Sequence, residues 1–299
     1  MSIDLTPKMR PSGKFRRVIS WVIGQKKATK TCPELPRLDG KRVLITGGAA
    51  GVGEFISRGL IERGAQVTSM ARGQSKGTGE LTDVRSLQVD LAEPQSIVAG
   101  VEQLGDTPFD LLICNAGLTV AEAQLTQIDV EKTFAVNVLG HHILYRLLIE
   151  KGLFSQDARI VMTTGDIYIM EDSCSINIPF DTSSKTYARS KLGNMWQVSE
   201  LTKRYPALHA IAVHPGVIAS GFAGSKEGFF AKVRDKLLIS EQAGAQASLI
   251  AATQNIPKGA YWNNVLGIVN LTNDDPALDH ENAARLWDEL ETVTTPYIE

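Results

Sequence analysis

Short apolar runs alternate with helix-length amphipathic stretches from Lys41 to near the end of the chain. Several of the short runs are apolar almost throughout, as is typical of parallel strands that helices cover on both faces. The pattern predicts strands at Arg42–Thr46, Gln66–Met70, Ser86–Val89, Phe109–Cys114, Arg159–Thr163, His209–Val213 and Val265–Val269. It predicts helices at Gly51–Arg63, Pro94–Gln103, Thr126–Lys151, Ser184–Arg204 and Glu241–Thr253. Residues 39–299 are therefore expected to form one doubly wound α/β domain with a mainly parallel sheet flanked by helices.

Residues 1–38 follow a different pattern and are interpreted as a basic N-terminal extension. Eight basic residues and no acidic residue lie between Lys8 and Lys30. Within this arm, apolar residues recur at the spacing of one helix face, with Trp21 off its centre: Phe15, Val18, Ile19 and Val22. A basic amphipathic helix of this kind can make peripheral contact with a membrane. Packing of the arm on the domain or on a second subunit is the alternative that we favour.

Composition and charge place the chain among ordinary globular proteins. The sequence is 43% hydrophobic, and its formal net charge of -2 gives no indication of nucleic-acid binding. Three widely spaced cysteines without a C-x-x-C motif, and no apolar run long enough to span a bilayer, indicate a reduced, cytoplasmic protein. No metal site is expected, because no carboxylate or cysteine stands at chelating spacing from the histidines at positions 141, 142 and 214.

A glycine-rich turn follows the first predicted strand and opens a helix. It reads Thr-Gly-Gly-Ala-Ala-Gly-Val-Gly over residues 46–53. Glycines let the backbone approach a pyrophosphate closely, and the positive end of the helix stabilises its charge. A turn of this composition is otherwise a plain loop, but its position favours a Rossmann-type dinucleotide site. The predicted contacts are Gly47, Gly51, Val52 and Gly53.

The segment after the second strand favours NADP(H) over NAD(H). An NAD site usually holds the ribose hydroxyls with an acidic residue at this point. Residues 66–79 contain no acid, but they contain Arg72 and Lys76, which suit a 2′-phosphate. The alternative is that these are two solvated basic residues in a loop.

Further motifs stand in a fixed order along the chain. They are Asp90, Cys114-Asn115-Ala116-Gly117, Asn137, Tyr187-x-x-x-Lys191 and His214-Pro215-Gly216. With the glycine turn, this ordered set resembles the short-chain dehydrogenase/reductase superfamily over about residues 39–299. The segments Asn137-Val-Leu-Gly-His141, Ser190-Lys191-Leu192, Gly259-Ala-Tyr261 and Leu286-Trp287 are most similar to the retinol-dehydrogenase-like branch.

The resemblance implies further cofactor contacts. Asp90 and Leu91 would lie beside the adenine, and Tyr187 and Lys191 would also touch the cofactor. The remaining contacts implied are Asn115, Ala116 and Gly117 after the fourth strand, and Pro215, Gly216 and Val217 beside the nicotinamide. Asp90 could instead cap a turn, and Asn115 could brace the sheet.

Tyr187 and Lys191 are the predicted reacting pair, four residues apart on one helix face. A free tyrosine has a pKa near ~10, and a neighbouring ammonium is expected to lower it toward the working range. The resemblance implies that Asn137 holds a water linked to the lysine. The alternative is a buried asparagine that satisfies helix carbonyls.

The hydroxyl that usually polarises the substrate oxygen in this family is missing. The position that matches the family's serine is Gly165. Thr164, one residue earlier, is the predicted replacement. Asp166 is an alternative, and Ser173 and Ser175 lie farther along in a loop.

These residues predict hydride transfer between NADP(H) and an alcohol or carbonyl. The residues Ile167, Tyr168, Met170, Phe222, Phe229 and Phe230 suggest a small apolar substrate such as a steroid, a retinoid or a long-chain carbonyl, and residues 218–240 are expected to form a lid over it. The rival hypothesis is a regulatory protein that binds NADP(H) without turnover. A homo-oligomer is expected only by analogy with the family.

Overall fold

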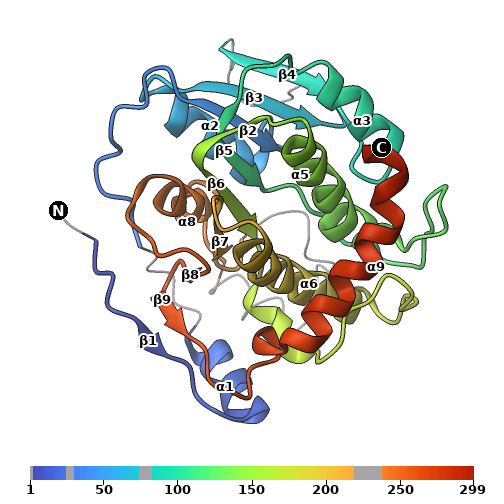
Figure 1. The fold of residues 1–299 in the computed structure, drawn as a ribbon. Coiled ribbons are helices and arrows are strands. Elements are labelled where there is room, and N and C mark those ends of the chain that lie inside the picture. Colours follow the sequence, from blue (N-terminus) through green and yellow to red (C-terminus); the bar gives the residue numbers. More distant parts are fainter. Residues whose placement is uncertain (1–2, 25–29, 74–82, 219–237) are drawn as a thin grey trace.

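The computed structural model describes residues 3–24, 30–73, 83–218 and 238–299 (Figure 1). These residues contain a nine-stranded sheet in the order β1-β9-β8-β7-β6-β5-β2-β3-β4. The strands are β1 (Lys8–Met9), β2 (Arg42–Thr46), β3 (Gln66–Ala71), β4 (Val84–Gln88), β5 (Phe109–Cys114), β6 (Phe154–Thr163), β7 (His209–His214), β8 (Tyr261–Asn263) and β9 (Gly267–Asn270). All neighbouring strands are parallel except β8 and β9, so the predicted fold class is confirmed.

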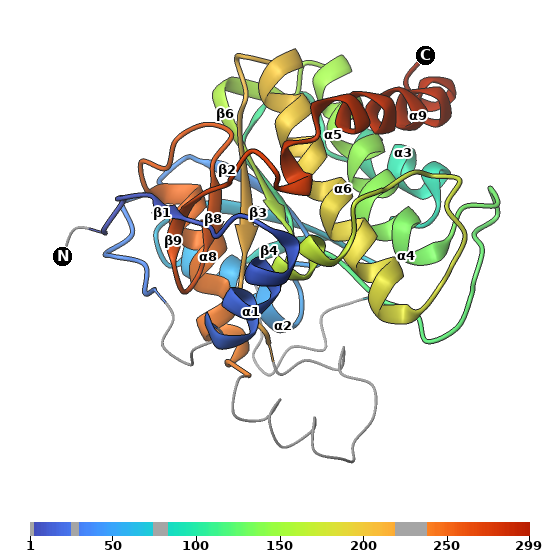
Figure 2. The ribbon, with the colours of Figure 1, turned by 90° about the horizontal axis from the view of Figure 1, so that it is seen from below.

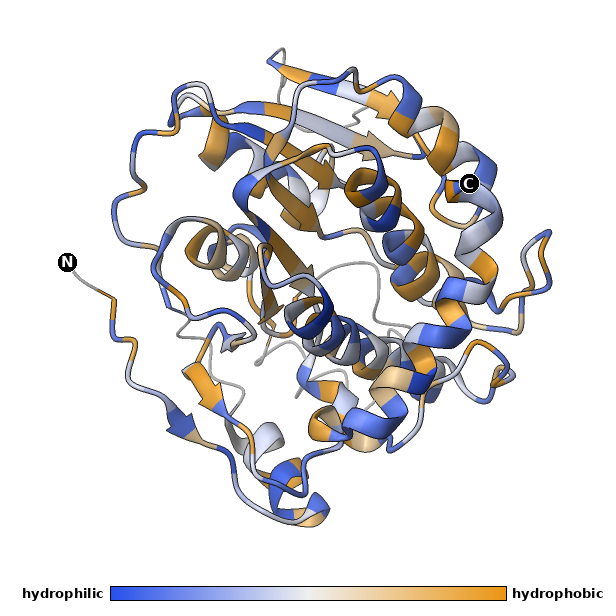
Figure 3. Cartoon of the chain, in the orientation of Figure 1, coloured by the Kyte–Doolittle hydropathy of each residue, from blue (hydrophilic) through white to orange (hydrophobic). Residues whose placement is uncertain are grey.

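Helices cover both faces of this sheet (Figures 1 and 2). On one face, α2 (Gly51–Ile61) packs against α8 (Glu241–Thr253). The opposite face is covered by α3 (Pro94–Glu102), α5 (Gly140–Glu150) and α6 (Ser183–Arg204), with α9 (His280–Ile298) packed across them. The shorter elements are α4 (Lys132–Phe134), η1 (Ala135–Leu139), η2 (Asp166–Met170) and η3 (Pro276–Leu278). Because both faces are buried, the central strands are apolar nearly throughout, as Figure 3 shows.

The structure differs from the predicted elements at several places, and the helix α9 was not predicted. The helix expected from Thr126 begins only at Lys132, because the Glu131 carboxylate caps it by accepting a 2.8 Å hydrogen bond from the Phe134 amide. The strand expected at Val265–Val269 is present as β9, which begins two residues later, and it forms an antiparallel hairpin with β8, which was not predicted. The Asn263 side chain holds its turn by accepting hydrogen bonds from the amides of residues 265 and 266.

The described part of the N-terminal arm packs on the domain. Its strand β1 pairs in parallel with β9 at the edge of the sheet, and α1 (Lys14–Gly24) packs against η2. The helix presents Arg17 and Trp21 inward, whereas Phe15 and Ile19 of the predicted apolar face are 77% and 41% exposed. The arm therefore adds a strand to the sheet and leaves part of its apolar face uncovered.

Candidate active site

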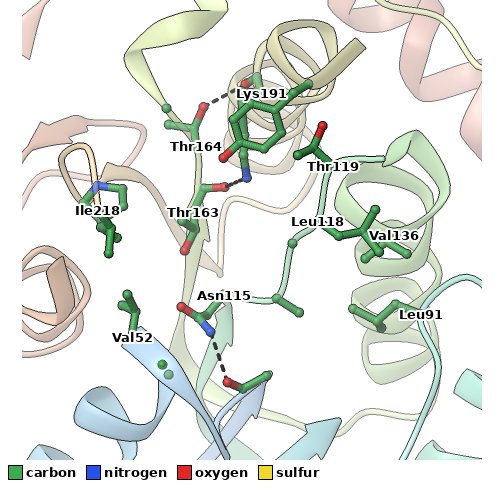
Figure 4. A pocket seen from close by; sticks show the side chains of 18 of the residues that line it. Val52, Leu91, Asn115, Leu118, Thr119, Val136, Thr163, Thr164, Lys191 and Ile218 are labelled. Carbon is green, nitrogen blue, oxygen red and sulfur yellow. Dashed lines mark hydrogen bonds between the residues drawn. The ribbon is translucent and has the colours of Figure 1, made fainter. Parts of the chain in front are cut away.

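A cavity of about 1090 Å³ lies where the carboxyl ends of β2, β3, β5, β6 and β7 meet (Figure 4). Ligand pockets in proteins commonly measure ~300–1,000 Å³, so this one has room for a large ligand or for two. The edge of a doubly wound sheet at which the strands end is the usual place for a ligand in such folds. The predicted cofactor contacts all line this cavity.

The glycine turn forms the floor of the cavity where α2 begins. Gly47 and Gly51 adopt positive φ values of 66° and 57°. A Cβ atom at Gly53 would lie 2.0 Å from the carbonyl oxygen of Gly47, so a side chain there would force the turn open. Ala50 precedes the helix and offers it no side-chain cap. The first amides of α2 are therefore left for an anion, and the turn fits the pyrophosphate of a dinucleotide.

The described residues that follow β3, up to residue 73, bring a positive charge to the cavity. They contain no carboxylate. Arg72 is exposed and lines the cavity, while Lys76 lies outside the described residues. Asp90 also lines the cavity, and its carboxylate caps a turn by accepting a 2.9 Å hydrogen bond from the Ala92 amide. Both interpretations of Asp90 are thus compatible with its position.

Asn115 braces the sheet as well as lining the cavity. Its side-chain amide donates to the Thr46 carbonyl at 3.1 Å. The amides of Asn115 and Ala116 both donate to the Thr46 hydroxyl at 3.0 Å. This network joins the ends of β2 and β5 and fixes the loop in which Gly117 follows. Across the cavity lie Pro215, Gly216 and Val217 after β7.

Tyr187 and Lys191 both project from α6 into the cavity wall. The Lys191 ammonium lies 5.3 Å from the centre of the Tyr187 ring and donates a 3.1 Å hydrogen bond to the Thr163 carbonyl (Figure 4). Burial lowers the pKa of Lys191 to about 8. Burial also raises the pKa of Tyr187 to about 12, so the expected lowering by the ammonium is not seen in the chain by itself. The phenol is therefore protonated at neutral pH.

Asn137 lies in the π-helical turn η1 behind the cavity rather than in its wall. Its side-chain oxygen accepts from the Leu118 amide at 2.8 Å, and its side-chain nitrogen donates to the Leu118 carbonyl at 2.9 Å and to the Ser190 hydroxyl at 3.0 Å. These bonds fix the loop after β5 against α6. The role of Asn137 in holding a water remains a prediction.

The end of β6 decides which hydroxyl could face a substrate. Thr164 donates its hydroxyl to the Lys191 carbonyl at 2.7 Å, so it could serve a substrate only after breaking this bond (Figure 4). A Cβ atom at Gly165 would approach no atom closer than 3.7 Å, so a side chain has room there. Thr163 also lines the cavity, and its hydroxyl has no hydrogen-bond partner among the described residues. Thr163 was not predicted as a site residue, although strand alternation places it on the same side as Gly165.

Asp166 cannot act as a proton donor in this structure. Although burial acts to raise its pKa, His214 and Arg10 together with hydrogen bonds lower it. The carboxylate is thus ionised and able only to accept. Ser173 and Ser175 do not line the cavity.

The predicted substrate-pocket residues divide into three groups. Ile167 lines the cavity, but Tyr168 is buried behind it and Met170 is exposed at the surface, so these two are wrong as pocket residues. Phe222, Phe229 and Phe230, with residues 219–237 of the expected lid, lie outside the described residues. Trp21 of the arm lines the cavity and was not predicted to do so.

The histidines near the site have structural partners. His141 contacts the Thr46 hydroxyl at 2.9 Å, and His142 contacts Glu291 at 2.8 Å. Within the described residues, no group of three or more histidine, cysteine or acidic side chains could hold a metal ion. No described helix is long and apolar enough to cross a membrane.

Comparison with known sequences identifies relatives over most of the chain. The model of a family described as short chain dehydrogenase matches residues 41–227. Human dehydrogenase/reductase SDR family member 12 is 29% identical over 248 residues, which cover 76% of this chain and 78% of that protein. Human retinol dehydrogenase 12 is 32% identical over 210 residues, which cover 63% of this chain and 65% of that protein.

Solved structures share the fold. An uncharacterised protein from Mycobacterium paratuberculosis superposes with a TM-score of 0.70 at 27% identity, covering 90% of this chain and 98% of its own. A blue fluorescent protein from a metagenomic library, in complex with NADPH, gives a TM-score of 0.61 at 21% identity, covering 77% of this chain and 98% of its own.

Proposed function

The chain belongs to the short-chain dehydrogenase family of oxidoreductases, which act on CH–OH groups with a nicotinamide cofactor, and we propose that it interconverts an apolar alcohol and its carbonyl with NADP(H). Its similarity to retinol dehydrogenases is confirmed by the relatives found. The observation that carries the proposal is the placing of Tyr187 and Lys191 in the wall of the cavity that the glycine turn opens.

The glycine turn and the strand ends supply the groups that would hold the cofactor. The amides at the start of α2 suit the pyrophosphate, and Arg72 suits a 2′-phosphate. Asp90 and Leu91 suit the adenine, and Pro215 to Val217 suit the nicotinamide. When bound, the cofactor supplies or accepts the hydride. The NADPH bound to the structural neighbour supports this choice of cofactor by analogy.

A protonated Tyr187 would serve as the proton donor when a carbonyl is reduced. A phenol whose pKa is raised to about 12 is protonated at neutral pH and can donate its proton to a carbonyl oxygen. Lys191, with a pKa of about 8, is mostly charged at that pH and stabilises the tyrosinate that remains. The retained pair also argues against a regulatory protein without turnover.

The lining of the cavity favours an apolar substrate. Ile167, Leu118, Val136 and Ile218 line it together with Trp21. Buried apolar surface contributes roughly 25 cal/mol per Å² to binding, so steroids, retinoids and long-chain carbonyls fit this class.

Replacing Tyr187 by Phe tests the proposed reaction. Tyr187→Phe keeps the ring but removes the proton donor, so NADPH oxidation over a panel of apolar aldehydes and ketones should fall by at least ~10²-fold. Binding of NADPH, followed by its fluorescence, should stay nearly unchanged. Tyr205→Phe is the matched control, because that half-buried tyrosine does not line the cavity. Turnover by the Tyr187→Phe variant at the native rate would place the chemistry elsewhere.

Restoring a serine at Gly165 should increase turnover. Gly165 has extended backbone angles that any residue can adopt, and the Thr164 hydroxyl is donated to Lys191. A serine hydroxyl aimed at the substrate oxygen should raise kcat by roughly tenfold, since one such donor contributes on the order of 10²-fold or more elsewhere. Gly165→Ala adds the same Cβ without the hydroxyl and should not raise kcat. An equal effect of both changes would contradict the idea.

Arg72 should determine the preference for NADP(H). Arg72→Ala should remove most of the difference in affinity between NADPH and NADH, about 1–3 kcal/mol for a charge-assisted contact. Titration of both cofactors into both proteins measures it, and Arg63→Ala, which does not line the cavity, is the control. Tighter binding of NADH than NADPH by the native chain would refute the assignment.

The exposed apolar side chains of the arm support a peripheral membrane contact. Five large apolar side chains are exposed among the described residues, and four lie on the arm or on η2 beneath it: Met9, Phe15, Ile19 and Met170. Arg16 on the same helix is exposed and suits anionic lipids, whereas the exposed Lys14 is paired with Asp172 at 2.8 Å.

Co-sedimentation with vesicles tests this contact. The native chain should sediment with vesicles of phosphatidylglycerol and phosphatidylcholine, less so at high salt, and Phe15→Glu with Ile19→Glu should abolish it. Leu125→Glu is the control, because Leu125 is the fifth exposed apolar residue and belongs neither to the arm nor to η2. Equal sedimentation of all three proteins would rule out the arm as the membrane contact.

A further inference from the structure

Arg10 carries a positive charge from the arm into the interior beside the cavity. Its amide donates to the Asn270 carbonyl at 2.9 Å, which extends the pairing of β1 with β9. Its side chain is only 6% exposed, forms an ion pair with Asp166 and donates to the Tyr168 hydroxyl at 2.9 Å. The guanidinium also lies 5.4 Å from the ring centres of Tyr168 and Tyr261. The arm is thus anchored by a buried charge and not by its apolar residues alone.

The partner of Arg10 belongs to the turn at which the family's serine would stand. Asp166 follows Gly165 directly and lines the cavity. Its carboxylate accepts hydrogen bonds from the Tyr261 hydroxyl at 2.6 Å and from the Asn263 amide at 2.7 Å. Its own amide donates to His214 at 3.4 Å. Asp166 therefore connects the ends of β6, β7 and β8 with the arm.

The same arm contributes a wall of the cavity. Arg17 holds α1 in place through a 2.7 Å ion pair with Asp274. One turn farther along the helix, Trp21 packs on the core and lines the cavity. Because α1 packs against η2, which begins at Asp166, the positions of Trp21 and of the Gly165 turn depend on each other.

We propose that the N-terminal arm is part of the active site: Arg10 is a positioning residue that holds the Gly165–Ile167 turn through Asp166, and Trp21 is a specificity-determining residue for the apolar substrate. This inference rests on the proposed function. A buried carboxylate without its counterion must rearrange or take up a proton, so loss of Arg10 shifts the turn beside the substrate. Removing both charges leaves a neutral side chain at position 166, and Asp275, a buried carboxylate 3.9 Å from Arg10, keeps its hydrogen bonds from the Tyr168 hydroxyl and the Ala277 amide, so the turn can stay in place.

Kinetics of single and double variants test the role of Arg10. Arg10→Met should lower kcat by roughly 10–100-fold, because displacements of ~1 Å in an active site cost this much, while the Kd for NADPH stays within about twofold. Asp166→Asn should be similarly impaired, and the double variant should recover most of the loss. Arg146→Met is the matched control: Arg146 is 11% exposed and paired with Glu291 at 2.7 Å, and neither residue lines the cavity. It should lose stability without losing kcat.

Trp21→Ala tests the second part of the proposal. It should raise KM for the apolar carbonyl by about tenfold with little change in kcat, since an aromatic side chain contributes mainly buried apolar area. The same variants are titrated with anilinonaphthalene sulfonate in the presence of NADPH, which measures apolar binding without turnover. Trp21→Ala and Arg10→Met should both weaken the binding of this probe by about tenfold.

The outcomes separate this inference from the proposed function. Native kcat and KM per folded molecule in Arg10→Met, or a loss of kcat in Arg146→Met as large as in Arg10→Met, would overturn the positioning role of Arg10. Unchanged KM and unchanged probe binding in Trp21→Ala would overturn the role of Trp21. If the native chain turns over no carbonyl but the variants weaken probe binding as expected, the proposed function fails while the arm still completes the cavity.

Discussion

The junction between β2 and β5 is the contact on which the site depends. The Thr46 hydroxyl is completely buried and accepts hydrogen bonds from two backbone amides of the loop after β5. The ring of His141, which contacts this hydroxyl, is also buried. Burial lowers the pKa of His141 to about 4, so this histidine stays neutral and can share a proton with the hydroxyl. One residue farther along, the close approach of Gly53 to the Gly47 carbonyl lets α2 begin directly at this junction. The cavity therefore forms at a point where three segments are fixed by short backbone contacts.

Burial, more than pairing, sets the protonation of the reacting groups. Tyr187 and Lys191 lie close together, yet desolvation disfavours the charged form of each side chain. It therefore raises the pKa of Tyr187 and lowers the pKa of Lys191. A phenol kept protonated in this way can donate its proton to a substrate oxygen as negative charge develops on that oxygen. The end of β6 prepares for the loss of that proton, because the Thr163 carbonyl accepts a hydrogen bond from Lys191 and so holds the ammonium near the ring on which the tyrosinate charge would form.

The arm provides the counterion for the buried carboxylate of Asp166. A carboxylate that is 4% exposed at the end of a central strand would be costly without a cation, and the sheet itself provides only neutral hydrogen-bond donors and a histidine of lowered pKa. Arg10 supplies the charge from the far edge of the sheet. Polar contacts thus hold the arm on the domain, and Phe15 and Ile19 can face outward.

The sequence by itself determined the parallel sheet, the glycine turn and the Tyr187/Lys191 pair, because each depends on local spacing: period-2 and helical patterns, glycines at a strand end, and four residues on a helix face. It also identified the gap at Gly165. It could not determine the partners of side chains that meet across the sheet. Thr164 bonds to Lys191, which lies 27 positions away, and Asp166 is paired with Arg10, which lies 156 positions away. Trp21 meets the other lining residues only at the cavity. Those contacts were decided by the tertiary structure, because burial and long-range packing, rather than local pattern, set which polar groups must find each other.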